Sequence, residues 1–310
     1  MTTDVLQMIL DCSVFAVSHS GIIAVHNVIS NIDLLAIRWN VNPEIFDIGR
    51  FSLRYYSLCF VAAFFTSYLI LQHNFLKAHK PQRLLDALTV YVFVGTIIGA
   101  RLGHCLFYEF DYYRHHLLEI ILPYKFSKDG TFQLTGYQGL ASHGGAVGIL
   151  LSVLLFCKKY RQSFFYMADQ LVIVVAISSF FIRIGNLFNS EIIGRPSALP
   201  WAFIFERIDN VPRHPAQLYE AIAYLLLFFF LGYYYKMKTT KHKSGYLFGL
   251  FLVLLFSIRF LIEFIKEPQE AFENNMDLDM GQWLSIPFIA IGIYLMYIKR
   301  LRPNKKTLII

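Results

Sequence analysis

The sequence predicts an all-α, polytopic membrane protein with about seven transmembrane helices. The chain of 310 residues is 56% hydrophobic and its mean hydropathy is +0.49. A soluble domain of this size would expose too much apolar surface at these values. Aromatic residues make up 17% of the chain, and aromatic rings favour the boundaries of a bilayer. Both observations place the chain among integral membrane proteins.

Seven segments are apolar and long enough to span a hydrocarbon core of about 30 Å. In chain order they lie near Phe51–Leu71, Leu84–Tyr108, Gly139–Cys157, Tyr166–Ile184, Ala216–Tyr235, Gly245–Phe264 and Gln282–Ile298.

The charge of the connections predicts how these segments are oriented. The connections after the first, third, fifth and seventh segments contain Lys and Arg but no Asp or Glu, whereas the other connections contain most of the acidic residues. By the positive-inside rule, the basic connections face the cytoplasm. The N-terminus is then outside and the C-terminus is cytoplasmic. The long connections lie on the outer side, and we expect them to be irregular and to cover a functional site.

The formal net charge of +7 has two possible explanations, a nucleic-acid surface or cytoplasmic loops. The basic residues are distributed over four separate short connections, so we expect a membrane and no nucleic acid as partner. The four cysteines, Cys12, Cys59, Cys105 and Cys157, form no CxxC pair and have no metal-ligand spacing. We therefore expect small buried hydrophobic residues at these positions and neither a metal nor a cofactor.

Three regions are expected along the chain. Residues 1–42 form an N-terminal extension of uncertain status, residues 43–302 the transmembrane domain, and residues 303–310 a basic cytoplasmic tail. Within the extension, Val5–Ile29 is apolar but is interrupted by Asp11, His19, His26 and Asn27. It is either an amphipathic segment at the outer surface or an upstream extension of a misassigned start, and no role is assigned to it.

Polar residues gather at the outer ends of the predicted helices. A charge deep in a bilayer costs about 2.5–3.5 kcal/mol on insertion scales, so each such residue needs an explanation. A transporter would place its polar residues near the midplane, whereas these residues indicate a pocket open to the outer leaflet. They are Arg101, His143, Arg183, Asn186, Asn189, Glu191, His214, Arg259 and Glu263.

Structural explanations compete with functional ones at several of these positions. Arg259 and Glu263 are four residues apart on one helix face and could neutralise each other. Arg101 could extend to the interface, and it lies within a Gly-x-x-x-Gly spacing that favours close helix packing. Arg183 has no carboxylate three or four residues away on its helix. An arginine without a local carboxylate indicates a phosphate ligand, which the guanidinium binds through two hydrogen bonds.

His143 begins a helix in the run Ala-Ser-His-Gly-Gly. A histidine in this position could act as a general base near neutral pH. It could also have a purely structural role at the helix end, and both interpretations are kept.

Several runs resemble the family of bacterial prolipoprotein diacylglyceryl transferases. The most specific run is Arg183–Arg195, Arg-Ile-Gly-Asn-Leu-Phe-Asn-Ser-Glu-Ile-Ile-Gly-Arg. The resemblance extends in order from about Pro43 to about Arg302. It also includes Gly99–Gly103, the His143-Gly-Gly run, Pro212–Glu220, Arg259–Phe264 and Met280–Pro287.

The resemblance implies an enzyme of the bacterial plasma (inner) membrane with its active site facing the outer leaflet. Such an enzyme transfers the diacylglyceryl group of phosphatidylglycerol to the lipobox cysteine thiol of prolipoprotein signal peptides, forming a thioether and releasing glycerol phosphate. By resemblance, the catalytic residues are His143, Arg183 and Arg259. The residues implied to bind phosphatidylglycerol are Arg183, Asn186, Glu191, Gly194, Arg259, Glu263, Tyr56 and His214.

Three positions depart from the family pattern. The usual Trp-Tyr-Gly triplet is replaced by Tyr55-Tyr56-Ser57, Lys266 stands where arginine is commoner, and Phe181 replaces a glycine. The alternative to the transferase is a lipid or anion transporter that uses the same outer-leaflet arginines for binding only. An intramembrane protease lacks support, because the chain has no GxSx or HExxH motif and no paired intramembrane aspartates.

Overall fold

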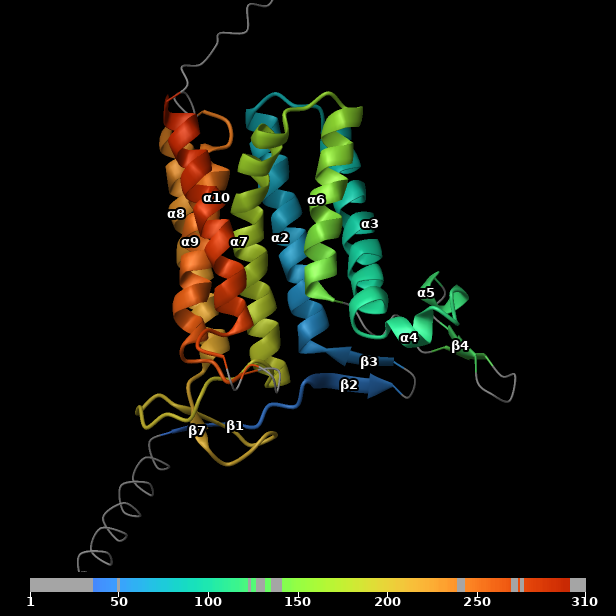
Figure 1. Cartoon of the computed structure of the whole chain (residues 1–310), viewed down its shortest axis with the longest axis vertical. Coiled ribbons are helices and arrows are strands. Elements are labelled where there is room, and N and C mark those ends of the chain that lie inside the picture. Colours follow the sequence, from blue (N-terminus) through green and yellow to red (C-terminus); the bar gives the residue numbers. More distant parts are fainter. Residues whose placement is uncertain are drawn as a thin grey trace, which may run out of the picture. The chain divides into compact units, whose positions relative to one another are not determined.

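The computed structural model describes residues 36–48, 51–121, 124–126, 132–134, 141–238, 243–268, 273 and 276–301. Helices occupy all seven predicted positions, with ends that lie within a few residues of those expected (Figure 1). They are α2 (Tyr55–Lys77), α3 (Gln82–Phe107), α6 (Ser142–Lys159), α7 (Phe164–Asn189), α8 (Ala216–Lys238), α9 (Tyr246–Glu263) and α10 (Met280–Leu301).

Six of the described helices are long and apolar enough to cross a membrane. The helix left out is α6, which begins with Ser-His-Gly-Gly and ends with Lys158 and Lys159. These polar ends leave a short apolar stretch between them. The mostly helical structure confirms a polytopic membrane protein, while the seventh span and the orientation of the termini stay predictions.

The described chain forms two compact units. Unit 1 comprises the described residues within 1–63, 176–230 and 252–291, and unit 2 those within 64–175, 231–251 and 292–310. The division passes through α2, α7, α8, α9 and α10, so each of these helices contributes one part to each unit.

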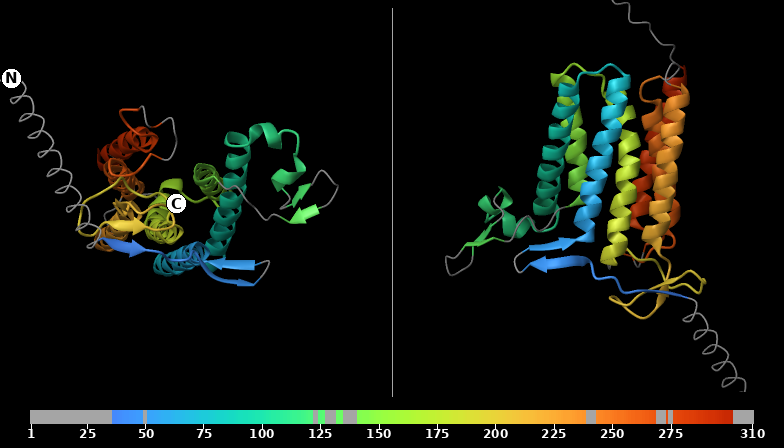
Figure 2. Two further views of the ribbon diagram at one scale, coloured as in Figure 1. Left: turned by 90° about the horizontal axis from the view of Figure 1, so that it is seen from below. Right: turned by 180° about the vertical axis from the view of Figure 1, so that it is seen from behind.

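In unit 2, helices α3 and α6 pack against each other through glycine, and both views of Figure 2 show them side by side. Gly95, Gly99 and Gly103 of α3 face Gly144 and Gly148 of α6 in antiparallel order. A methyl group built on Gly103 would lie 2.7 Å from the Cα of Gly144, and one on Gly144 would lie 2.7 Å from the Cα of Gly103. Small residues at four-residue spacing allow two helix backbones to approach this closely.

The core of unit 2 lies at the opposite end of these two helices. Leu85 and Leu88 of α3 pack with Phe75 and Phe156, all at most 1% exposed.

Asp169 of α7 accepts hydrogen bonds from the backbone N–H groups of Gly245 (2.6 Å) and Phe248 (2.8 Å). Its carboxylate thereby caps the N-terminus of α9, where the first N–H groups have no partner within the helix.

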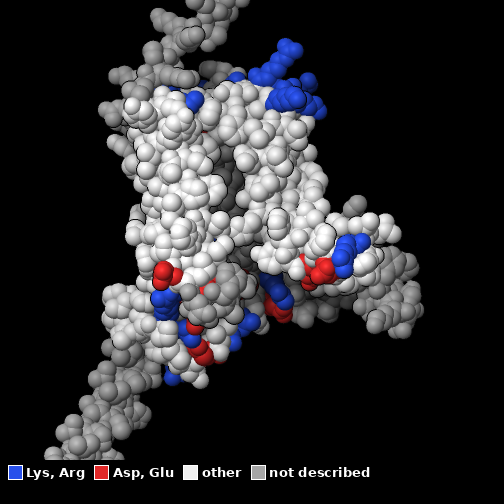
Figure 3. Space-filling view, in the orientation of Figure 1, with Lys and Arg blue, Asp and Glu red and all other residues white. Residues whose placement is uncertain are grey.

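Charge is separated along α3 and α6 in unit 2. Arg83 lies where α3 begins, and Lys158 and Lys159 lie where the antiparallel α6 ends. Glu109 and Asp111 follow the other end of α3. In Figure 3 the helix faces between these two ends are white, which indicates that Lys, Arg, Asp and Glu are scarce on the face shown.

Short strands precede α2 and occupy parts of the connections that the sequence predicted to be outer and irregular. In unit 1, β1 (Ile37–Trp39), β6 (Phe203–Phe205) and β7 (Pro212–Arg213) form a three-stranded sheet. Strands β2 (Glu44–Ile48) and β3 (Phe51–Arg54) form a hairpin that leads directly into α2. In unit 2, α4 (Phe110–Tyr113), α5 (Leu118–Ile121), β4 (Tyr124–Phe126) and β5 (Phe132–Leu134) follow α3.

The position of β1 bears on the N-terminal extension. This strand falls within the predicted extension 1–42, yet Ile37, Arg38 and Trp39 pair in parallel with residues 203–205. The indole of Trp39 donates a hydrogen bond to the carbonyl of Leu187 (3.0 Å). Residues 37–39 are therefore bound into unit 1. Most of the extension, residues 1–35, lies outside the described residues, as does the tail 303–310.

The glycine contact between α3 and α6 gives a first prediction. Gly103→Leu should lower the free energy of unfolding by at least about 1–3 kcal/mol, because the added side chain meets the backbone of Gly144 and forces the helices apart. The measurement is thermal unfolding in detergent. Gly232→Leu on α8 is the matched control, because a Cβ at Gly232 meets no atom within 4 Å. Equal effects of the two substitutions would contradict the prediction.

Candidate active site

A buried group of ion pairs lies in unit 1, centred on Glu220 of α8. The carboxylate of Glu220 is 0% exposed and lies between two cations. Its Oε2 is 2.8 Å from Nε of Arg183 on α7, and its Oε1 is 3.0 Å from Nζ of Lys266, which follows α9. The hydroxyl of Tyr224 donates to the same Oε1 (3.3 Å). One carboxylate therefore links three parts of the chain that are distant in sequence.

Lys266 also binds a second buried carboxylate. Its Nζ donates a hydrogen bond to Oε2 of Glu263 (3.1 Å). The side chain of Glu263 packs against Gly281 at the start of α10, where a Cβ would lie 2.5 Å from the carboxyl carbon. This contact explains a glycine in the Met-Gly-Gln-Trp run, because any larger residue would displace Glu263.

Arg259 has no carboxylate partner among the described residues. The sequence left open whether Arg259 and Glu263 neutralise each other, but Glu263 pairs with Lys266 instead. The Nε atom of the half-buried Arg259 is itself buried and has no hydrogen-bond partner among the described residues. Arg259 and Arg183 both lie close enough to Tyr224 to interact electrostatically with its hydroxyl. A buried donor without a partner is costly, so this arrangement favours an anionic ligand at Arg259.

The segment after Arg183 forms a hydrogen-bonded chain. Arg183 donates from its guanidinium to Oδ1 of Asn186 (3.2 Å), and Asn186 donates from Nδ2 to Oε2 of Glu191 (3.1 Å). Asn189 donates to the other oxygen of Glu191 (2.9 Å). Because these polar side chains satisfy one another, α7 continues to Asn189 rather than ending at the predicted Ile184.

The turn that follows α7 is held by unusual backbone conformations. Ser190 and Ile192 have φ values of 56° and 59°, which non-glycine residues rarely adopt. The side-chain amide of Gln217 donates to the carbonyl of Glu191 (2.5 Å) and so fixes the turn against α8. Strained backbone of this kind is frequent at functional sites.

Gly194 brings this segment against Lys266. The N–H of Gly194 donates to the carbonyl of His214 (3.0 Å), and the N–H of Arg195 donates to the carbonyl of Ile265 (2.8 Å). A Cβ on Gly194 would lie 2.6 Å from the Cβ of His214 and 2.9 Å from the carbonyl oxygen of Ile265. Gly194 therefore allows three backbone segments to meet, and it acts on the site through Lys266.

Arg213 and His214 belong to the same supporting structure. Arg213 is buried and donates to Asp209 (2.5 Å) and to Glu267 (2.8 Å). The imidazole of His214 lies 3.5 Å from the hydroxyl of Tyr219 and packs edge-on against that ring. Burial lowers the pKa of His214 below its ordinary value, which favours the uncharged imidazole.

Tyr56, the second residue of α2, lies against Gly185 of α7. A Cβ on Gly185 would lie 2.8 Å from the ring of Tyr56. The neighbouring Tyr55 stacks on Phe188 with ring centroids 4.5 Å apart. Tyr56 is within electrostatic range of Arg183 and Glu191. The structure thus brings together all predicted site residues of unit 1 with the ion pairs or with the segment that supports them.

His143 and Arg101 lie in unit 2. The side chain of His143 is exposed in the first turn of α6. Arg101 is buried and donates to the carbonyls of Ile120 (3.1 Å) and Glu119 (2.6 Å), while its guanidinium lies 5.0 Å from the ring centroid of Tyr113. These contacts give Arg101 a structural role in holding α5 against α3.

Two central residues, Glu220 and Lys266, were not among the predicted site residues. Glu220 occurs near the start of an apolar helix, and a carboxylate in that setting is costly unless it is paired. Lys266 comes two residues after the end of the sixth predicted segment, where a charge also needs a partner. The sequence therefore indicated that each residue needs a partner, although the pairing of Glu220 with Lys266 could not be derived from their spacing.

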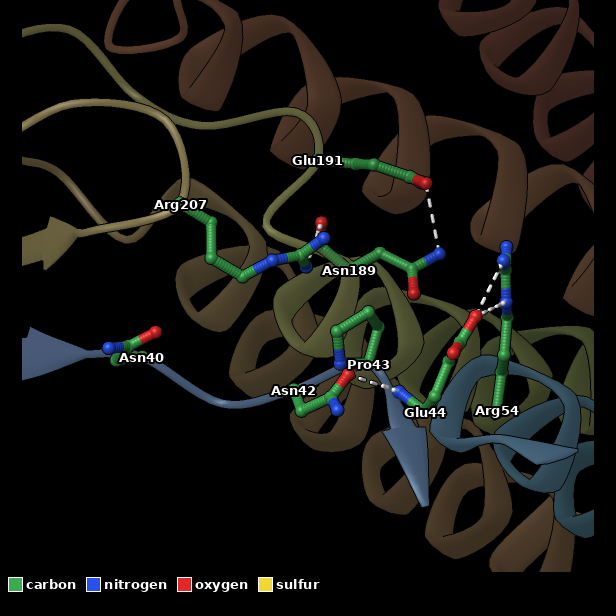
Figure 4. Close-up of a pocket in the computed structure, with 8 residues that line it drawn as sticks. All are labelled: Asn40, Asn42, Pro43, Glu44, Arg54, Asn189, Glu191 and Arg207. Carbon is green, nitrogen blue, oxygen red and sulfur yellow. Dashed lines mark hydrogen bonds and ion pairs between the residues drawn. The ribbon is translucent and has the colours of Figure 1, made fainter. Parts of the chain in front are cut away.

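A polar cleft adjoins the site in unit 1. It has a volume of about 530 Å³ and is lined by Asn40, Asn42, Pro43, Glu44, Arg54, Asn189, Glu191 and Arg207 (Figure 4). Glu191 and Asn189 take part both in this lining and in the hydrogen-bonded chain from Arg183. Among the described residues, no group of three or more His, Cys, Asp or Glu is arranged to hold a metal ion.

Comparison with known proteins gives a consistent result. The family model of prolipoprotein diacylglyceryl transferase matches residues 43–298. A phosphatidylglycerol–prolipoprotein diacylglyceryl transferase of Bacteroides fragilis is 48% identical over 264 residues, which cover 85% of this chain and 95% of the relative. Proteins of the same name from Tolumonas auensis and Chloroherpeton thalassium are 42% and 41% identical, covering 83% and 84% of this chain and 95% and 93% of the relatives.

The buried ion pairs give a second prediction. Glu220→Ala should lower the free energy of unfolding by about 3–5 kcal/mol, because it leaves the charge of Arg183 without its carboxylate partner and leaves Lys266 with Glu263 alone. Thermal unfolding in detergent measures the change. The control is Glu206→Ala, which breaks the ion pair with the exposed Arg38 and should cost no more than about 1 kcal/mol. A Glu220→Ala protein as stable as this control would contradict the prediction.

The Asp209–Arg213 pair gives a third prediction. The hydrogen bond from Arg213 holds the pKa of Asp209 below its ordinary value. A lowered carboxyl pKa contributes stability above the unfolded pKa of about 3.9, and that stability is lost as the pH falls through the lower folded pKa. Asp209→Asn should therefore lower the unfolding temperature at pH 7 but have a diminishing effect below about pH 3.9. Because the side chain of Asp209 is 29% exposed, the contribution at pH 7 should not exceed about 1 kcal/mol. A difference that persists unchanged at pH 3 would exclude this titration as its cause.

Proposed function

The chain belongs to the prolipoprotein diacylglyceryl transferase family, and from this we infer that it is a transferase that moves the diacylglyceryl group of phosphatidylglycerol to a prolipoprotein. The family model and the relatives cover the same transmembrane region. The acceptor is proposed to be the thiol of the lipobox cysteine, which forms a thioether, and the leaving group to be glycerol phosphate.

The observation that carries the proposed site is the unpaired cation at Arg259. The surrounding group contains three cations, Arg183, Arg259 and Lys266, and two carboxylates, Glu220 and Glu263. Both carboxylates are bound by Arg183 or Lys266, so neither forms an ion pair with Arg259. A phosphodiester carries one negative charge, and a guanidinium binds phosphate through two parallel hydrogen bonds.

Arg183 is the second phosphate ligand in this proposal. Glu220 binds its Nε and Asn186 binds its Nη1, which restricts the guanidinium to one orientation. A fixed donor costs little reorganisation when charge develops on the substrate. Asn186, Glu191 and Gly194 serve the site through this arrangement, and Glu263 serves it by holding Lys266. Tyr56 and His214 complete the proposed binding residues.

The reaction needs a thiolate, because the thiol itself is a poor nucleophile. We assign His143 as the base that accepts the thiol proton, and this role rests on the family resemblance and on the exposure of its side chain. The thiolate sulfur attacks the C3 carbon of the diacylated glycerol. A carbon–sulfur bond forms, the carbon–oxygen bond to phosphate breaks, and its electron pair remains on the phosphate oxygen. Arg183 and Arg259 stabilise the second negative charge that the phosphate then acquires.

The site is proposed to face the outer leaflet of the bacterial plasma membrane. The connection between α7 and α8 and the one after α9 carry the supporting residues. They are two of the long acidic connections that the positive-inside rule places outside. A lipid or anion transporter would use the same arginines, but the names of the relatives and the family model do not favour it.

The fourth prediction tests the phosphate-binding residues. Arg259→Ala and Arg183→Ala should each lower the rate of transfer by about 10²–10³-fold, the usual effect of removing one preorganised charge donor. The assay uses purified protein, phosphatidylglycerol vesicles and a synthetic lipobox peptide, and follows lipidated peptide and released glycerol phosphate. Arg38→Ala serves as the control because Arg38 is exposed.

The outcomes separate the alternatives. Movement of lipid between leaflets without lipidated peptide would replace the transferase with the transporter. Substantial residual transfer by His143→Ala would show that another group accepts the thiol proton.

A further inference from the structure

The polar cleft beside Glu191 has a lining suited to a small hydroxylated anion. Seven of its eight lining residues are Asn, Glu or Arg, and pockets that bind small molecules commonly measure about 300–1,000 Å³. The side chains drawn in Figure 4 come from the segment after β1, from the β2–β3 hairpin, from the last residue of α7 and from the segments after α7 and β6. Amide groups can donate to and accept from hydroxyls, while arginine binds phosphate.

Arg207 is the cation in this lining that has no carboxylate partner among the described residues. The other arginine, Arg54, is bound by Glu44 at 2.9 Å. Within the described part of the chain, the guanidinium of Arg207 forms one hydrogen bond, to the carbonyl of Asn189 at 3.5 Å, which is the weak limit of a hydrogen bond. Its charge is therefore available to an anion that enters the cleft.

The cleft is continuous with the proposed reaction site through two residues. Asn189 and Glu191 line it, and Glu191 accepts the hydrogen bond of Asn186, which in turn binds Arg183. An anion that leaves Arg183 and Arg259 in the direction of Asn186 and Glu191 would therefore meet the lining of this cleft next.

The two products of the reaction have opposite solubility. The diacylglyceryl group is apolar and stays in the bilayer, whereas glycerol phosphate carries two hydroxyls and, once released, a second negative charge. The leaving group must therefore depart toward water. Of the residues on the polar side of the site, those of the cleft supply both an uncompensated cation and hydroxyl-binding amides.

We propose that this cleft is a product site that binds glycerol phosphate after the carbon–oxygen bond has broken, with Arg207 as its phosphate ligand and Asn40 among the groups that bind its hydroxyls. The proposal rests on the proposed function, because it takes glycerol phosphate as the leaving group. In this proposal the intact lipid and the released head group bind at different places. The phosphate of the intact lipid binds at Arg183 and Arg259, and released glycerol phosphate binds at Arg207.

The fifth prediction concerns product inhibition. In Arg207→Gln, the inhibition constant of added glycerol phosphate should rise about tenfold or more, because a hydrogen bond to a charged group contributes about 1.5–3 kcal/mol. The KM for phosphatidylglycerol should stay within twofold of wild type. Asn40→Ala should raise the inhibition constant for glycerol phosphate but not that for inorganic phosphate, which has no carbon-bound hydroxyls.

The control is Arg38→Gln, which removes an exposed arginine of β1 that pairs with Glu206 outside the cleft lining; it should leave every constant unchanged. Equal unfolding temperatures of the variants would exclude misfolding. A raised KM with an unchanged inhibition constant would show that the cleft binds the intact lipid head group, and this would overturn the product site. No change in either constant, or a wild-type protein that glycerol phosphate does not inhibit, would overturn it as well.

A second measurement separates this proposal from the proposed function. Binding of glycerol phosphate to the purified protein without lipid or peptide is followed by calorimetry, in wild type and in Arg207→Gln. Binding lost in the variant supports the cleft even if the acceptor substrate has been wrongly assigned. Binding that is absent from wild type, or equal in both proteins, refutes the cleft even if transfer is confirmed.

Discussion

The buried carboxylate of Glu220 is the interaction on which the organisation of unit 1 depends. It is fully buried and lies between Arg183 of α7 and Lys266 after α9. Three charges within a low-dielectric region are stable only as a paired set, because each alone would carry a large desolvation cost. The requirement to pair them fixes α7, α8 and the end of α9 relative to one another within this unit.

The connection between α7 and α8 and the segment after α9 are ordered by this same requirement. Lys266 can reach Glu220 because the segment 265–267 pairs through its backbone with the segment 193–195. That pairing needs Gly194, where a side chain would collide with His214 and Ile265, and it is strengthened by Arg213, which binds both Gly194 and Glu267. Gly194 and Arg213 touch no substrate in our mechanism. Their role is to position Lys266 so that it can pair with Glu220.

The distribution of charge within the group connects structure with catalysis. Glu220 and Glu263 compensate Arg183 and Lys266, and Arg259 remains uncompensated. An enzyme that displaces a phosphate needs positive charge where negative charge develops, and a site that is already electropositive before substrate binds provides it without rearrangement.

The sequence by itself determined the membrane class, the positions of the seven helices and most of the candidate residues from which the proposed site is built. These properties are local. Hydropathy over about 20 residues identifies a spanning helix, and a charged residue within an apolar run can be recognised without knowing its partner. Only the tertiary structure decided the partners. Arg183 has no carboxylate three or four residues away on its own helix, yet it pairs with Glu220 of α8. Arg101 has the same sequence context as the other intramembrane arginines, yet it binds the backbone of α5. The short strands around Phe203 and Ile37 were also missed, because their pairing joins residues more than 160 positions apart. Ion pairs and strand pairs between distant segments depend on which segments meet in space, and spacing along the chain carries no information about that.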